Sequence, residues 1–129
     1  MREANDVNDC ITQLVETINK YYKRNRSLID TISKAQLSEE KAIRAITKAA
    51  THCGCIEFCA KKQPADLDAQ VSVLASGRLC EICSEKIEKE LGQSIFYLIS
   101  LMVLLGYNPV EIINRENNKI KMLGKFNLR

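Results

Sequence analysis

Two short cysteine pairs are the residues of this chain whose type and spacing could do chemistry. Cys53 and Cys55 lie in the stretch "THCGC", and Cys80 and Cys83 form "CEIC" further along. Zinc prefers four soft, deprotonated ligands in a tetrahedron, and two closely spaced pairs supply them at little cost in loop entropy. A C-x-x-C before a helix also favours thiolate, because the helix N-terminus stabilises negative charge. We therefore predict that these cysteines hold a structural zinc ion, which ties the loop at 63–79 to the helices on both sides.

The first pair can bind one ion only if the helix ends between its members. In an unbroken helix Cys53 and Cys55 point to nearly opposite sides, so Gly54 must let the backbone leave helical geometry. If the helix continued, Cys55 and Cys59, four apart on one face, would be the better donors. His52, the only histidine, would then lie one turn before Cys55 as a further reserve ligand.

Other roles for the cysteines stay open. Free cysteine is often a small buried apolar residue, and we adopt this interpretation for Cys10 and Cys59. Cys80 and Cys83 could instead exchange a metal for a disulfide, as in a thiol-based redox or metal sensor. The opening "MREANDVNDC" is polar and acidic rather than a secretory signal. We therefore expect a cytoplasmic protein, whose reduced thiols favour metal over disulfides.

Composition and charge predict a single helical domain over residues 1–129. The chain has 46% hydrophobic and 27% charged residues, as in an ordinary soluble globule. Its formal net charge is only +3, with basic residues scattered among acids, so nucleic-acid binding is not expected. The longest apolar run, from Ile95 to Gly106, is too short to span a bilayer, so no membrane partner is expected.

The apolar periodicity predicts helices and no strand. The expected helices span about 6–34, with a bend or break at "KRNRS", then 38–62, 84–105 and 109–123. Ser38 and Asn108 are the expected N-caps of the second and fourth helices, and Gly106 and Gly124 are the expected stops. An irregular loop is expected between the second and third helices. The predicted fold is all-α, a four-helix bundle.

The last two expected helices resemble a known family. The stretch "EKELGQSIFYLISLMVLLGYNPVEIINRENNK" is similar to the third and fourth helices of the MazG-like all-α nucleoside-triphosphate pyrophosphohydrolases. In that family an E-x-x-D on the third helix joins an E-E-x-x-E on the preceding helix. The four acids hold Mg²⁺ ions, which grip the triphosphate while water attacks, because carboxylate oxygens suit this hard cation. The resemblance implies a MazG-like four-helix bundle, which is dimeric or tetrameric in that family.

Carried over residue by residue, the resemblance implies catalytic roles for Glu57, Glu90 and Gln93. Glu90 matches the Glu of the family's E-L-G-D, and Gln93 stands in place of its Asp. Glu57 matches the last Glu of E-E-x-x-E, whose leading acids fall on Cys53 and Gly54. The loss of two charges predicts much weaker Mg²⁺ binding, since cysteine is a soft ligand and glutamine carries no charge.

The segment from about Ile43 to Leu128, with "CGC…CxxC" and "LGKFNL", resembles more closely a group of small firmicute proteins without an established activity. We therefore expect a non-catalytic binding or regulatory protein with a degenerate magnesium site and a cysteine metal clip. A homodimer is the expected assembly, and a nucleotide ligand is compatible with the resemblance. The alternatives are a magnesium-dependent nucleoside-triphosphate pyrophosphohydrolase and a thiol-based sensor.

Overall fold

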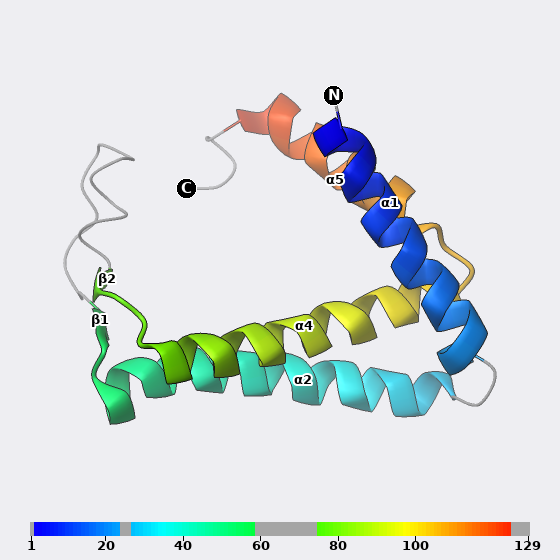
Figure 1. The fold of residues 1–129 in the computed structure, drawn as a ribbon. Coiled ribbons are helices and arrows are strands. Elements are labelled where there is room, and N and C mark those ends of the chain that lie inside the picture. The colour runs from blue at the N-terminus through cyan, green and yellow to red at the C-terminus, as the bar shows by residue number, and fades with distance from the viewer. Residues whose placement is uncertain (1, 24–26, 59–74, 125–129) are drawn as a thin grey trace. The chain divides into compact units, whose positions relative to one another are not determined.

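The structure is a computed structural model that describes residues 2–23, 27–58 and 75–124. In these residues it is a four-helix, all-α fold (Figure 1). The helices are α1 (Arg2–Thr17), α2 (Leu28–Lys48), α4 (Glu81–Leu104) and α5 (Pro109–Leu123). Short π-helical turns, Ile18–Tyr22 and Ala49–Cys53, continue α1 and α2. The all-α, four-helix class predicted from the sequence is confirmed.

The chain divides into two compact units, and the boundary between them falls inside α2 and inside α4. One unit comprises Met1–Ala35 and Ile95–Arg129, and the other is Gln36–Ser94. The expected single domain over residues 1–129 stays a prediction.

The first unit has a core built from two pairs of residues, each pair one helical turn apart. Ile18 and Tyr22 on the π turn after α1 meet Ile99 and Val103 on α4, and all four are buried. Burial of such side chains stabilises the fold by about 1.5–3 kcal/mol each. The Tyr22 hydroxyl is 2.8 Å from Thr31 Oγ1, so its polar end is satisfied inside the core.

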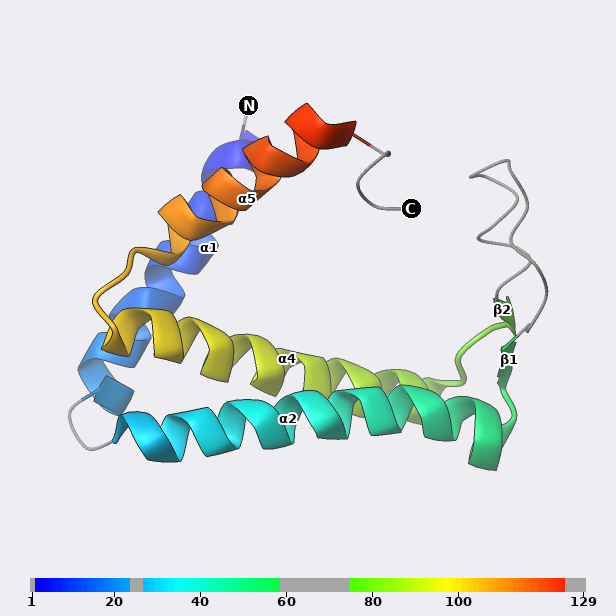
Figure 2. The same cartoon turned by 180° about the vertical axis from the view of Figure 1, so that it is seen from behind.

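The second unit carries a smaller core, in which α2 and α4 run side by side (Figures 1 and 2). Ala45 of α2, Ala49 of the π turn after it and Ile87 of α4 are buried, and Cys55 and Cys83 pack against them. This core therefore lies directly against the cysteine pairs.

Next to this core the chain forms a two-stranded antiparallel sheet. Strand β1 (Ile56–Phe58) pairs with β2 (Ala75–Gly77), so that Ile56 lies opposite Gly77. The expectation of a strand-free chain is therefore wrong, because pairing of distant segments needs no long local alternation. Of the irregular loop predicted at 63–79, residues 63–74 lie outside the described residues.

The predicted start of the second helix is wrong. Ser38 is not an N-cap but is buried inside α2, with 3% of its surface exposed. The cap is Ser27, whose Oγ accepts a hydrogen bond from the Asp30 N–H at 3.0 Å. The sequence from Leu28 to Lys48 contains no Gly or Pro, so nothing interrupts the helix at Ser38.

The predicted end of that helix, at about Lys62, is also wrong, because the helical turns end at Cys53. Gly54 follows in the left-handed conformation, with φ 78°, and its N–H donates to the Ala49 carbonyl at 2.9 Å. This closing turn is a common helix terminus, which a residue with a Cβ adopts only under strain.

The later boundaries agree with the sequence predictions more closely. Helix α4 begins at Glu81, one turn before the expected Ser84, and ends before Gly106, which has φ 85°. The Val110 N–H donates to Asn108 Oδ1 at 3.0 Å, which confirms the predicted N-cap of α5. Gly124 ends α5 with φ 61°, as expected.

Among the described residues, no single helix combines the length and apolar character needed to cross a bilayer. Helices α4 and α5 taken together reach that length and composition, but the chain bends by 108° between them.

Candidate metal centre

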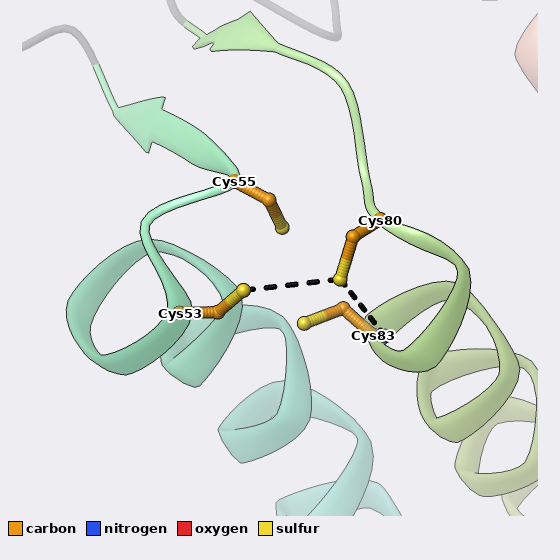
Figure 3. A group of neighbouring side chains, drawn as sticks. All are labelled: Cys53, Cys55, Cys80 and Cys83. Carbon is orange, nitrogen blue, oxygen red and sulfur yellow. Dashed lines mark hydrogen bonds between the residues drawn. The ribbon is translucent and has the colours of Figure 1, made fainter.

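The four cysteines predicted as ligands come together at one place. The Sγ atoms of Cys53, Cys55, Cys80 and Cys83 all lie within 4.8 Å of one another. Figure 3 shows their side chains pointing toward a common centre from two separate chain segments. Cys53 ends the π turn after α2, Cys55 precedes β1, Cys80 precedes α4 and Cys83 lies in the first turn of α4. The grouping expected from the sequence is thus present in the structure.

The spacing of the sulfur atoms fits a tetrahedral metal site. A metal–sulfur distance of about 2.3 Å implies sulfur–sulfur edges of about 3.8 Å in a regular tetrahedron. The Sγ atoms of Cys53 and Cys80 are 3.8 Å apart. A disulfide would need about 2.05 Å, and all four cysteines are free thiols. The arrangement could therefore hold a metal ion without first breaking a covalent bond.

Gly54 allows the side chains of Cys53 and Cys55 to point toward the same place. Because the helix ends at Cys53 and Gly54 has φ 78°, Cys55 leaves the helical path that would have turned its side chain away. The helix therefore ends between Cys53 and Cys55, which is the condition predicted from the sequence for both residues to bind one ion. Cys55 is held further inward, with its Sγ 3.7 Å from the Ala49 carbonyl oxygen.

Gly77 positions the second segment against the first, and sequence reasoning did not assign it this role. A Cβ at Gly77 would lie 2.5 Å from the Cys55 carbonyl oxygen and 3.2 Å from Ile56 Cα, and its φ is +90°. The Arg78 N–H donates to the same Cys55 carbonyl at 3.2 Å. Glycine permits this close approach of two backbones. The signal that could have revealed it is a glycine just before the second cysteine pair.

The thiols differ in their electrostatics. The Cys83 N–H donates to Cys80 Sγ at 3.4 Å, and this bond, followed by the Cys83 thiol, lowers the pKa of Cys80 to about 7. The neighbouring Cys80 sulfur, followed by burial, raises the pKa of Cys83 to about 12. The Cys83 thiol lowers the pKa of Cys53, but the Cys80 and Cys55 sulfurs and burial outweigh it, so that this pKa is raised. Only a bound cation would make four adjacent thiolates favourable.

The reserve ligands do not join this cluster. His52 is exposed, with Nδ1 at 2.9 Å from Thr51 Oγ1. Cys59 lies outside the described residues. Cys10 is exposed, so the interpretation of it as a buried apolar residue is wrong. Among the residues whose side chains are described, Leu14, one turn later, packs against the core of this unit.

The residues carried over from the MazG-like family lie on different elements. Glu57 is exposed on β1 opposite Ser76, so the expectation of a helical position is wrong, because Gly54 ended the helix before it. Glu90 and Gln93 lie on α4, half-buried and exposed respectively. In the described part of the chain, the cysteines form the one cluster of three or more His, Cys, Asp or Glu ligands. Glu57 and Glu90 do not belong to that cluster.

A scan against protein-family models gave no match, and neither the curated proteins nor the solved structures gave one. The MazG-like resemblance therefore stays a prediction.

Proposed function

We propose that this chain is a zinc-binding helical protein that acts as a non-catalytic binding or regulatory protein. The observation that supports this is the convergence of four cysteine Sγ atoms within 4.8 Å. Thiolates are soft ligands, for which zinc is a preferred divalent partner among the metals of the cell. A site with four protein ligands is closed, because no position is left for a substrate or an attacking water. The zinc would be structural.

The proposed zinc acts as a clip between α2 and α4. Cys53 closes the turn that follows α2, and Cys83 lies in the first turn of α4. Because Cys55 and Cys83 also pack on Ala49 and Ile87, the clip would lie over the core of this unit. Zinc-binding free energy would then contribute directly to folding free energy.

We further propose that the MazG-like fold is retained here without its magnesium chemistry. The position of Glu57 on a strand, and the uncharged Gln93 in place of an acid, both argue against a four-carboxylate site. Mg²⁺ needs hard oxygen ligands in a near-octahedral arrangement. Two separate carboxylates supply too few of these for a triphosphate to be held in place for hydrolysis.

A homodimer is the proposed assembly. The second half of α4 carries exposed apolar residues in the three- and four-residue steps of a coiled-coil seam. Ile95 and Leu98 are 55% and 53% exposed, Met102 lies on the same stripe, and Leu105, 56% exposed, directly follows the last residue of α4. Isologous packing of this stripe on a second copy would remove it from water.

Two measurements test the proposal. Elemental analysis of protein purified without chelator should give about one zinc per chain. Incubation of the same protein with Mg²⁺ or Mn²⁺ and a panel of nucleoside triphosphates should release no diphosphate. Diphosphate release that is abolished by Glu90→Gln would identify the chain as a pyrophosphohydrolase. Absence of metal from the purified protein would contradict the proposed zinc site.

A thiol-based sensor is the second candidate, and the exposure of Cys53 favours it. Cys53 and Cys80 have adjacent sulfurs, so one peroxide could oxidise the two thiols to a disulfide while it is reduced to two waters. Zinc would leave, because a disulfide is no longer a thiolate ligand. Zinc release by mild peroxide, reversed by a thiol reductant, would support this function, and resistance to peroxide would contradict it.

A further inference from the structure

A second polar site lies in the same unit as the cysteines, in a groove between α2 and α4. Lys41, Arg44 and Lys48 line it from α2, and Lys86 and Glu90 from α4, over a volume of about 220 Å³. Ala45, which also lines the groove, is buried. The three α2 cations recur at steps of three and four residues, so they lie on one face of that helix.

The charges in this groove are not balanced. Four cations and one carboxylate give 4 − 1 = +3. The ion pairs found in the described residues, Lys34 with Asp30 and Lys119 with Glu116, include none of the groove residues. Four like charges so close together repel one another, and a bound anion would relieve that repulsion.

The side chain of Glu90 also restricts which ligands this groove can bind. Its Oε2 atom is buried and has no hydrogen-bond partner among the described residues. A buried acceptor without a donor is unfavourable, and more so when it is charged. An ionised carboxylate can only accept hydrogen bonds. A ligand with two properties would therefore bind favourably in this groove. Its negative charge would interact with the four cations, and its hydrogen-bond donor would pair with Glu90.

We propose that this groove binds a small phosphate anion that carries a hydroxyl group. Its charged oxygens accept hydrogen bonds from the lysine and arginine side chains, and its hydroxyl donates to Glu90 Oε2. The volume of about 220 Å³ is below the roughly 300–1,000 Å³ of sites for larger small molecules, which suits a phosphate group or a small phosphate ester. Sulfate, which has no proton near neutral pH, would be repelled by Glu90.

The groove is connected to the cysteine site through its two helices. Lys48 directly precedes the π turn that ends at Cys53, and Lys86 lies three residues after Cys83. A metal clip between Cys53 and Cys83 would fix the separation of the cations across the groove. Coupling between metal and phosphate rests on the proposed zinc site, whereas phosphate binding itself does not.

Calorimetric titration of the full-length protein tests the site at constant ionic strength. Inorganic phosphate and glycerol 3-phosphate are the probes, and sulfate is the comparison anion. At least one phosphate probe should bind with one-to-one stoichiometry and about tenfold more tightly than sulfate, since Glu90 accepts only from a ligand with a donor. Tighter inorganic phosphate identifies the free anion as the source, and tighter glycerol 3-phosphate identifies an ester.

Variants separate a built site from general surface charge. Lys86→Ala should weaken phosphate binding about tenfold, whereas Lys89→Ala, on the same helix but outside the groove, should change it less than about twofold. Glu90→Gln should remove the preference for phosphate over sulfate. Circular dichroism establishes that each variant keeps its helices.

Equal binding of phosphate and sulfate by the wild type, or equal losses in Lys86→Ala and Lys89→Ala, would overturn the proposed site. Absence of any saturable phosphate binding would do the same. The zinc proposal fails on a different result, the absence of metal from the purified protein. Phosphate binding that survives removal of the metal would retain the phosphate site and reject only the coupling.

Discussion

The Sγ atoms of Cys53 and Cys80 lie 3.8 Å apart, although the residues are 27 positions apart in the chain. A loop of this length costs conformational entropy when its ends are brought together, and the cost grows slowly with loop length. A contact between two neutral thiols offers little to offset it, because a thiol is a weak donor and a weak acceptor. The pairing of β1 with β2 and the core of Ala45, Ala49 and Ile87 bring these segments together, and a shared metal ion would add to that stabilisation.

Loss of one thiolate from the centre should destabilise the protein far more than loss of a thiol elsewhere. We expect Cys83→Ser to reduce bound zinc below half of the wild-type amount and to lower the melting temperature by at least about 10 °C. The matched control is Cys10→Ser, which changes an exposed cysteine outside the cluster and should shift the melting temperature by less than about 2 °C. Differential scanning calorimetry and elemental analysis measure both quantities. Equal small shifts in the two variants would show that the cysteines carry no shared ion.

The close contact between Gly77 and the Cys55 backbone predicts that a larger residue at position 77 destabilises the protein and weakens metal binding. Gly77→Ala places a Cβ 2.5 Å from the Cys55 carbonyl oxygen, at a φ of +90°. The strain should cost about 1–3 kcal/mol and weaken metal binding, because Cys55 is displaced. Chemical denaturation and a competition titration with a zinc chelator measure these effects.

Gly92→Ala is the matched control for that substitution. Gly92 lies inside α4, and a Cβ there meets nothing within 4 Å. Alanine is the better helix former, so this variant should be stabilised by about 0.5–1 kcal/mol with unchanged zinc affinity. If Gly77→Ala behaves like Gly92→Ala, the backbone contact at Cys55 does not position the ligand.

Local signals in the sequence predicted the parts of the fold that depend on local chemistry. Asn108 and the proline after it specify a helix start by themselves, since one supplies the cap and the other a suitable φ. The cysteine spacing predicted that Cys53, Cys55, Cys80 and Cys83 lie together, because the chemistry of zinc ligands restricts which residues can take part. Gly54 between two cysteines was similarly informative, because its left-handed turn was the condition for Cys53 and Cys55 to share an ion.

The parts that could not be predicted depend on distant segments. The pairing of Ile56 with Gly77 decides that Glu57 lies on a strand, and three-residue strands leave no periodic pattern to detect. Ser38 is a good capping residue, but α2 continues through it and buries it. Residue type alone does not distinguish a cap from a buried serine, since tertiary context overrides local preference.

Zinc affinity should rise steeply with pH. In the metal-free protein the pKa of Cys53 is raised from its ordinary value, and that of Cys83 is raised to about 12, so both thiols are mostly protonated at pH 8. Binding must release at least these two protons. The logarithm of the apparent association constant should therefore increase by two or more for each pH unit between pH 7 and 8. Competition with a chromophoric chelator of known pH dependence measures this slope, and a slope near zero would exclude Cys53 and Cys83 as ligands.

The exposed stripe on α4 predicts the assembly in solution. Leu98→Lys places a charge in the middle of the apolar seam formed with Ile95 and Leu105, and an unpaired charge in such an interface is costly. We expect the wild type to sediment as a dimer and this variant to sediment as a monomer with an unchanged zinc content. Met122→Lys is the control, because Met122 is 88% exposed and lies on α5 rather than on α4. A wild type that sediments as a monomer across the micromolar range, or a Leu98→Lys variant that remains dimeric, would reject an interface on this face of α4.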